Sequence, residues 1–107
     1  MRFPTEYYEE NPIGFDGSKV VHTFSASSNS WTATEDCYIC GFLYYTASMG
    51  ADNAYVVIAK APVASAGGVK IGATFYDGIG AVCAPVRKGQ KVVVHSSDYS
   101  QIKCYGK

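Results

Sequence analysis

The chain has 107 residues, a length typical of one domain with one hydrophobic core. Nine basic residues balance nine acidic residues, so no excess positive charge is available to hold a nucleic-acid backbone, and nucleic-acid binding is not expected. Hydrophobic residues make up 48% of the chain, yet no apolar run reaches the roughly 18 residues of a membrane-spanning helix, so no membrane contact is expected either. Composition therefore predicts a single domain that has much apolar surface to bury.

The first 17 residues differ in composition from the rest of the chain. They combine Pro4, Pro12, Gly14 and Gly17 with tyrosines and glutamates, which favours neither a helix nor a strand. We predict an extended N-terminal arm over 1–17, of the kind that packs on a neighbouring subunit or attaches to a larger body. Residues 18–107 are predicted to form the folded domain.

Short apolar segments separated by turn residues fill the folded domain. Nine tyrosines, eleven glycines and abundant valine and serine favour strands and turns over helices. Asp77 and Gly78 together form a strong turn signal. This pattern predicts an all-β antiparallel sandwich whose eight strands lie at 20–24, 31–34, 38–46, 55–59, 70–76, 81–86, 92–96 and 101–105.

The longest predicted strand, 38–46, is apolar on both faces. One face carries Tyr38 and the other carries Leu43 and Tyr45, so neither face alternates with polar residues. A sandwich core buries only one face of each sheet, and the second face therefore requires a cover. We expect that cover to be either the N-terminal arm or another copy of the chain.

The four cysteines, Cys37, Cys40, Cys83 and Cys104, leave three states open. Their number suits a tetrahedral zinc site, but a second CxxC pair is missing, and residues three apart on a strand point to opposite faces. Disulfides are the second state, typical of oxidising compartments. Since the N-terminus lacks the pattern of a secretion signal, buried free thiols without a bound metal are the expectation.

Few residues of the sequence are candidates for a catalytic role. His95 is followed by Ser96, Ser97 and Asp98, which together contain the side chains of a hydrolase triad. Triad members come from separate parts of a fold, whereas neighbours on a strand point away from one another. We therefore predict no enzyme, no catalytic residue and no cofactor. A hydrolase would require His95 to meet a distant carboxylate in a cleft.

Two predicted loops pair an aromatic ring with an acid. Tyr76 lies beside Asp77, and Tyr99 lies beside Asp98. Exposed aromatic rings next to carboxylates are typical of sugar-binding sites, so these four residues are the candidate ligand-binding site. The alternative is that they are ordinary loop tyrosines without a ligand.

Three segments resemble one family of virus proteins. Residues 31–42 (WTATEDCYICGF) are similar to a segment common in phage tail-fibre and head-fibre tip domains, and more distantly to the C1q and tumour-necrosis-factor jelly rolls. Residues 84–94 (APVRKGQKVVV) resemble a turn of these domains, and residues 100–107 resemble their last strand. Cys37 departs from the usual glycine and Gln90 from the usual aspartate, so any ion-binding role of that aspartate is not carried over.

The resemblance implies a jelly-roll β-sandwich (C1q/TNF-like) that assembles as a homotrimer, with the strands at 38, 92 and 101 on one inner sheet. The predicted trimer interface contains Tyr38, Leu43, Tyr45 and Val93.

The function implied is that of a non-enzymatic bacteriophage virion module, either a receptor-binding fibre tip or a capsid decoration. Its arm would contact other virion proteins, and a host surface glycan is the candidate ligand. The alternative is a bacterial C1q-like extracellular binding domain, which an export signal in the gene would favour.

Overall fold

The structure is a computed structural model that describes residues 16–62 and 67–107. The predicted arm at 1–17 lies outside the described residues except for Asp16 and Gly17. In the described part of the chain, no helix is long and apolar enough to cross a membrane.

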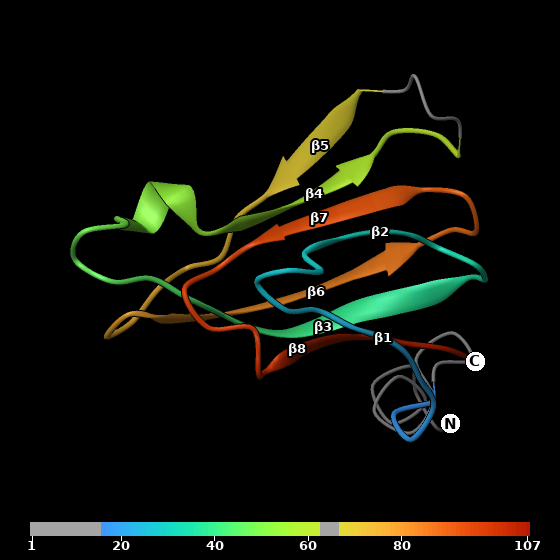
Figure 1. Cartoon of the computed structure of the whole chain (residues 1–107), viewed down its shortest axis with the longest axis horizontal. Helices are drawn as coiled ribbons and strands as arrows, with labels where there is room; N and C mark the ends of the chain where they lie inside the picture. Colours follow the sequence, from blue (N-terminus) through green and yellow to red (C-terminus); the bar gives the residue numbers. More distant parts are fainter. Residues whose placement is uncertain (1–15, 63–66) are drawn as a thin grey trace, which may run out of the picture.

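Eight strands and one short 3-10 helix form the described fold, as Figure 1 shows. Each strand overlaps one of the eight predicted from the sequence, and the predicted all-β class is confirmed. The elements are β1 (Val20–Thr23), β2 (Ser30–Thr32), β3 (Cys37–Tyr44), the 3-10 helix η2 (Ala51–Asn53), β4 (Tyr55–Ala59), β5 (Gly68–Ile71), β6 (Ile79–Val86), β7 (Lys91–His95) and β8 (Ile102–Tyr105).

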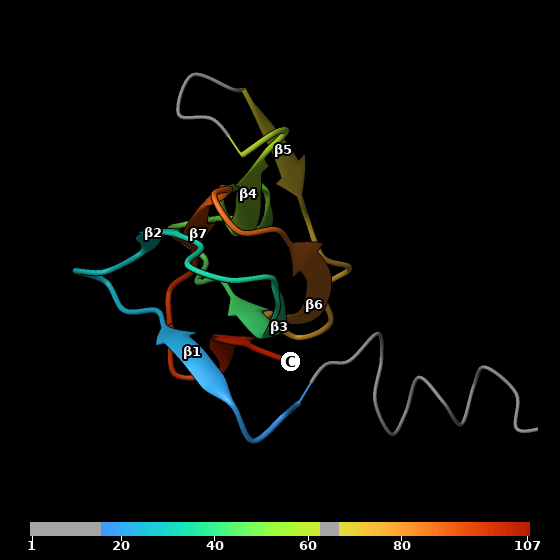
Figure 2. The same cartoon turned by 90° about the vertical axis from the view of Figure 1, so that its right-hand side faces the viewer.

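The strands form two antiparallel four-stranded sheets stacked as layers, which the end view of Figure 2 separates. The first sheet has the order β1-β8-β3-β6, and the second sheet has the order β2-β7-β4-β5. The expectation that the strands at 38, 92 and 101 share a sheet is wrong, because β3 and β8 belong to the first sheet and β7 to the second. Alternation along a single strand does not reveal which strand pairs with which.

The core lies between the two sheets. β6 alternates strictly between exposed and buried residues, which is the pattern of a strand with one face in the core. β3 likewise buries Cys37, Ile39 and Leu43 on its inner face. The most completely buried side chains come from both sheets and from the segment after β1, and they include Phe24, Ile39, Leu43, Val56, Val86, Val92, Val94, Ile102 and Cys104.

β5 differs most from its predicted range of 70–76. It covers Gly68–Ile71 and pairs with the short strand β4, whose Val56 lies opposite Ile71. The ladder ends there because β4 offers only Tyr55 beyond that pair before η2. Phe75 instead packs its ring edge-on against Tyr45, with 4.9 Å between the ring centroids.

Two glycines hold backbone conformations on which the first sheet depends. Gly41 has φ 149°, and a Cβ at this position would overlap the backbone carbonyl oxygen of Gln101. Gly78 follows Asp77 in a tight turn where both residues have positive φ, and Tyr76 and Ile79 exchange two backbone hydrogen bonds across it. This turn at Asp77 and Gly78 confirms the one predicted from the sequence.

Candidate assembly surface and loop site

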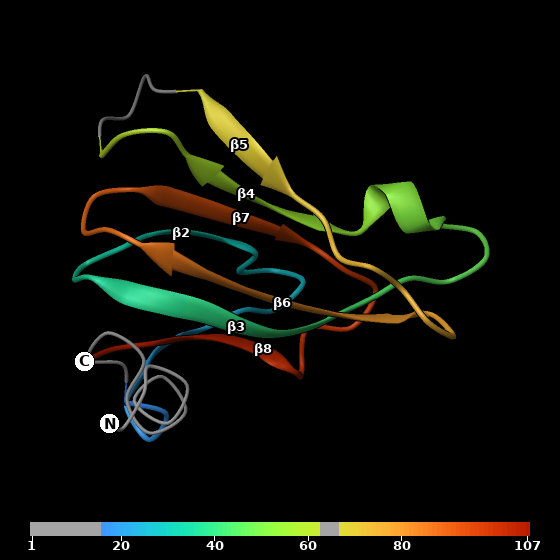
Figure 3. The ribbon, with the colours of Figure 1, turned by 180° about the vertical axis from the view of Figure 1, so that it is seen from behind.

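The outward side of the first sheet is almost entirely apolar. It faces away from the second sheet, which Figure 3 shows as the upper layer, and its inner strands are β8 and β3, with β1 and β6 at the edges. The outer face, as defined here, consists of Val20 and Thr23 from β1, Lys103 and Tyr105 from β8, Tyr38, Cys40, Phe42 and Tyr44 from β3, and Ile79, Ala81, Cys83 and Pro85 from β6. Thr23 and Lys103 are the only residues of this set that are neither apolar nor aromatic.

Several large side chains of the outer face are open to solvent. Phe42 is 44% exposed, Ile79 is 42% exposed and Val20 is 45% exposed. The outward residues of the second sheet are more polar, since Ser30, Thr32 and Lys91 are exposed there. An apolar sheet surface of this kind is typical of a protein interface rather than of a solvated face.

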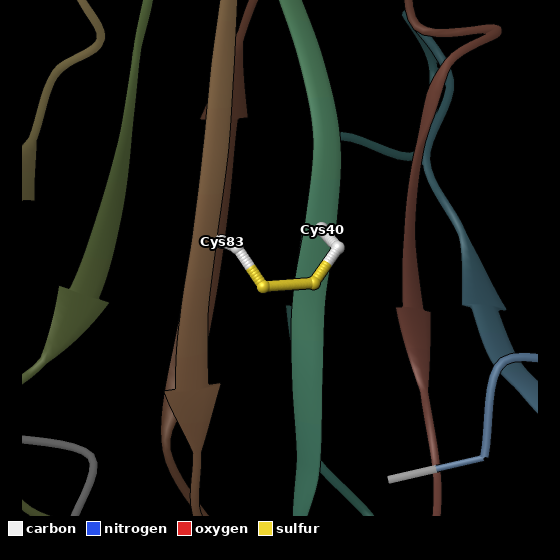
Figure 4. Close-up of a disulfide and its surroundings, with 2 residues drawn as sticks. All are labelled: Cys40 and Cys83. Atoms are coloured by element: carbon white, nitrogen blue, oxygen red, sulfur yellow. A yellow bond between two sulfur atoms is a disulfide. The ribbon is translucent and has the colours of Figure 1, made fainter. Parts of the chain in front are cut away.

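A disulfide bond on the outer face joins β3 to the edge strand β6. Cys40 on β3 and Cys83 on β6 are paired, and their Cα atoms are 4.1 Å apart because the two residues lie directly opposite in the ladder (Figure 4). The expectation of four free thiols is therefore wrong. The pair was hidden because the two cysteines are 43 positions apart in the sequence, and only the register of β3 with β6 brings them together.

The other two cysteines are free thiols buried in the core. Cys37 on β3 and Cys104 on β8 are hydrogen-bonded to each other. This contact and burial raise the pKa of the Cys104 thiol, which therefore stays protonated. Among the described residues, no three histidine, cysteine, aspartate or glutamate side chains gather as a metal site would need.

The predicted interface residues do not share one surface. Tyr38 belongs to the outer face, whereas Leu43 lies on the opposite side of β3 and is fully buried in the core. Tyr45 follows β3 and packs against Phe75 and the core. Val93 lies on the outward side of the second sheet, opposite Ser30.

The two candidate ligand-binding loops lie at the same end of the sandwich. The Ser97 N–H donates to the carbonyl of Tyr44 at the end of β3, and the Tyr45 N–H donates to the carbonyl of Gly78. The turn that carries Asp77 and the loop after β7 therefore flank the same strand end. Tyr76 is 87% exposed at this end.

Asp98 and Tyr99 are arranged differently from each other. The Ser100 N–H donates to Asp98 at 2.8 Å and holds the pKa of that carboxyl below its usual value, so Asp98 is an exposed carboxylate. The Tyr99 hydroxyl donates to the carbonyl of Val94, and its ring packs against the core. Both residues line a shallow depression of about 560 Å³. Tyr76 and Asp77 are not among the residues that line it.

The possible triad near His95 is not assembled. His95 contacts the ring of Tyr55 on the second sheet, with 4.7 Å between the ring centroids. The buried Ser96 hydroxyl points the other way, accepts from the Tyr44 N–H and donates to the carbonyl of Asp98. Ser96 thus ties the loop after β7 to the end of β3.

Comparison of the chain with protein-family models, with curated proteins and with solved structures finds no match. The resemblance to phage fibre tips and to C1q and tumour-necrosis-factor domains therefore stays a resemblance of short segments.

Sequence reasoning left open which side of β3 faces the core. The sequence of β6 gave no signal, because residues 79–86 contain no polar side chain, and only the structure shows that buried Gly80, Val82, Ala84 and Val86 alternate with exposed residues. Combined with the register of β3 and β6, that alternation assigns Phe42 to the outer face and Leu43 to the core.

Proposed function

We propose that this chain is a non-enzymatic structural module of jelly-roll type that assembles as a homotrimer and serves in a bacteriophage particle. The observation that carries the proposal is the apolar outer face of the first sheet, where Phe42 on the inner strand β3 and Ile79 on the edge strand β6 are exposed. The phage context is supported only by the similarity of residues 31–42 and 84–94 to fibre-tip segments.

The jelly-roll type is supported by the order of the strands. In the two sheets β1 pairs with β8, β2 with β7, β3 with β6 and β4 with β5. These are the pairs that arise when one long antiparallel strip, folded at the connection between β4 and β5, rolls up into two sheets. A double sheet of eight strands built this way is the jelly roll of viral capsid and lectin domains.

Self-association is supported by the energetics of the outer face. Covering a large side chain that is nearly half exposed, such as Phe42, Ile79 or Val20, contributes roughly 1 kcal/mol each per subunit. Three subunits that meet along this face would gain several kcal/mol, a substantial fraction of the stability of a small domain. Most soluble oligomers of identical chains have closed symmetry, and a trimer in which three outer faces meet around one axis has such symmetry.

The disulfide supports a location of the protein outside the reducing cytoplasm. Bonds such as Cys40–Cys83 persist in secreted proteins and on virion and cell surfaces. This observation agrees with a virion protein and equally with the alternative, a bacterial C1q-like extracellular binding domain. Mass spectrometry of purified particles and of the culture medium of the host separates the two.

Display of loops is the role that a trimer of this kind would serve. Tyr76, Asp77 and Asp98 are exposed at one end of the sandwich, so three copies would present them together. Aromatic rings beside carboxylates suit a host surface glycan as ligand. Tyr99 contributes less to such a site, because its hydroxyl is bonded to Val94.

The experiment that tests assembly compares two charge variants by light scattering coupled to size exclusion. Phe42→Glu places a carboxylate in the outer face, and its desolvation should leave the variant monomeric while the parent is trimeric. Thr32→Glu adds the same charge at an exposed position of the second sheet and should remain trimeric. Circular dichroism confirms that both variants fold. A folded Phe42→Glu variant with the mass of the parent would contradict the proposed interface.

A further inference from the structure

A second apolar feature lies at the end of the first sheet opposite to the loop site. It is a pocket of about 150 Å³ between the start of β3 and the end of β6, and Gly106 closes one side of it. Tyr38, Pro85 and Val86 are part of its wall, and the exposed residues Arg87, Lys107 and Asp36 stand at its rim. The C-terminus and the beginning of β1 lie at this same end of the molecule in Figure 1.

The chain enters the described fold directly beside this pocket. The Asp16 N–H donates to the carbonyl of Gly106 at 2.7 Å, and the Gly106 N–H donates to the carbonyl of Lys19 at 2.8 Å. Residue 15 is thus attached one residue away from a pocket wall. An extended chain covers at most about 3.4 Å per residue, so the seven residues 9–15 reach anywhere within roughly 24 Å of this anchor.

The chemistry of the preceding segment matches that of the pocket. Ile13 and Phe15, the residues nearest the anchor, are apolar, and Glu9 and Glu10 follow farther out. The pocket in turn has an apolar interior, and its rim carries Arg87 and the ion pair of Lys107 with Asp36, whose N–O distance is 3.8 Å. The full segment 1–15 carries one arginine and three glutamates, so its net charge is opposite to that of the rim.

We infer that residues 1–15 dock intramolecularly on this end of the first sheet, with Ile13 or Phe15 in the pocket and Glu9 and Glu10 beside Arg87 and Lys107. The covalent link at Asp16 makes the docking intramolecular, because a short tether gives an effective concentration in the millimolar range. The N-terminal segment of another copy would be present only at the protein concentration, which is lower than this effective concentration. Tyr38 and Pro85 belong both to this pocket and to the outer face, so the docked segment would lie at one end of the surface that is proposed to join the subunits.

Cleavage by a glutamate-specific protease tests the docking in the full chain. Cleavage after Glu9 and Glu10 is followed by intact mass, and a synthetic peptide of residues 1–17 gives the rate for an undocked segment. We expect the parent to be cut at least about tenfold more slowly than the peptide, because bound segments open before they are cleaved. A parent that is cut at the rate of the peptide would overturn the inference.

Three variants identify the contacts responsible. Phe15→Ser combined with Ile13→Ser should restore most of the cleavage rate of the peptide. Arg87→Glu should raise the rate about two- to fivefold, the size expected of exposed charge pairs. Lys70→Glu makes the same charge change on β5 of the second sheet and should leave the rate unchanged. Equal cleavage of the parent, the Phe15 and Ile13 double variant and the Arg87 variant would contradict docking in this pocket.

The dependence of cleavage on protein concentration separates the two modes of docking. The rate should be constant from low to high micromolar concentration, including concentrations at which light scattering gives a monomer. Protection that grows with concentration would mean that another copy supplies the segment, and would overturn the intramolecular assignment.

Discussion

Gly41 shows how a single residue sets the shape of the first sheet. Its φ of 149° and the approach of the Gln101 backbone leave no room for a side chain at the middle of β3. The Phe42 N–H donates to the carbonyl of Gln101 at 2.8 Å, so the same contact fastens the start of β8 to β3. A glycine inside an otherwise bulky apolar strand therefore has a packing cause here.

Replacing Gly41 by alanine should destabilise the fold. Both the unfavourable φ and the overlap with Gln101 act against a Cβ, and we expect the free energy of unfolding to fall by at least about 2 kcal/mol. Urea denaturation of Gly41→Ala and of the parent measures the difference. Gly72→Ala serves as the control, because a Cβ at Gly72 meets open space. Equal stability of Gly41→Ala and the parent would refute the close approach.

His22 is a second residue with a measurable consequence. Its ring stacks on Trp31 with 4.8 Å between the centroids, and among the described residues its Nε2 atom has no hydrogen-bond partner. Burial lowers its pKa from the ordinary value of 6.5, against the opposing effect of a hydrogen bond to the Ser28 backbone.

The depressed pKa of His22 predicts a pH-dependent stability. Below about pH 6.5 the unfolded chain binds a proton that the folded chain does not bind, so the free energy of unfolding should decrease as the pH falls from 7.5 towards 5. His22→Phe keeps an aromatic ring in place and should flatten this dependence. Thermal unfolding of both proteins across this pH range gives the comparison. Identical pH profiles would show that His22 does not titrate differently on folding.

At the scale of elements, β3 and β6 are joined twice, by their ladder of eight residue pairs and by the Cys40–Cys83 bond. Protein purified without reductant and then denatured should therefore contain two reactive thiols per chain, Cys37 and Cys104. Reduction before titration should raise the number to four. Titration with a thiol reagent counts both, and four thiols without reduction would contradict the disulfide.

The strands themselves were predictable because their signals are local. Apolar runs bounded by turn residues indicated all eight, and Asp77 with Gly78 indicated the turn before β6. The end of β5 was not predictable, since it depends on the length of its partner β4. The Cys40–Cys83 pair was hidden for a related reason, because it depends on the register of two distant strands.

The candidate site was predictable only in part. The sequence indicated that β3 carries a second apolar face, and in the structure Phe42 lies exposed on the outward side of β3. It did not indicate that Leu43 faces the core or that Val93 lies on the other sheet, because the assignment of faces needs the pairing of whole sheets. The meeting of the two loops beside Tyr44 was likewise a result of the fold.

At the scale of the whole molecule, the two ends and the outer face of the sandwich have different proposed roles. Exposed Tyr76 and Asp98 lie at the end proposed for display, and the pocket beside Gly106 lies at the end proposed for the N-terminal segment. The outer face between them is proposed to join the subunits. Self-association through that face is the claim on which the proposed function depends.

The mass of the parent protein in solution tests that claim most directly. Light scattering coupled to size exclusion, at micromolar concentration and without reductant, should give three times the 11.5 kDa mass of the chain. The mass should stay constant on tenfold dilution, since a buried apolar interface of this kind dissociates only at low concentration. A particle of 11.5 kDa, or a dimer, would contradict the trimer.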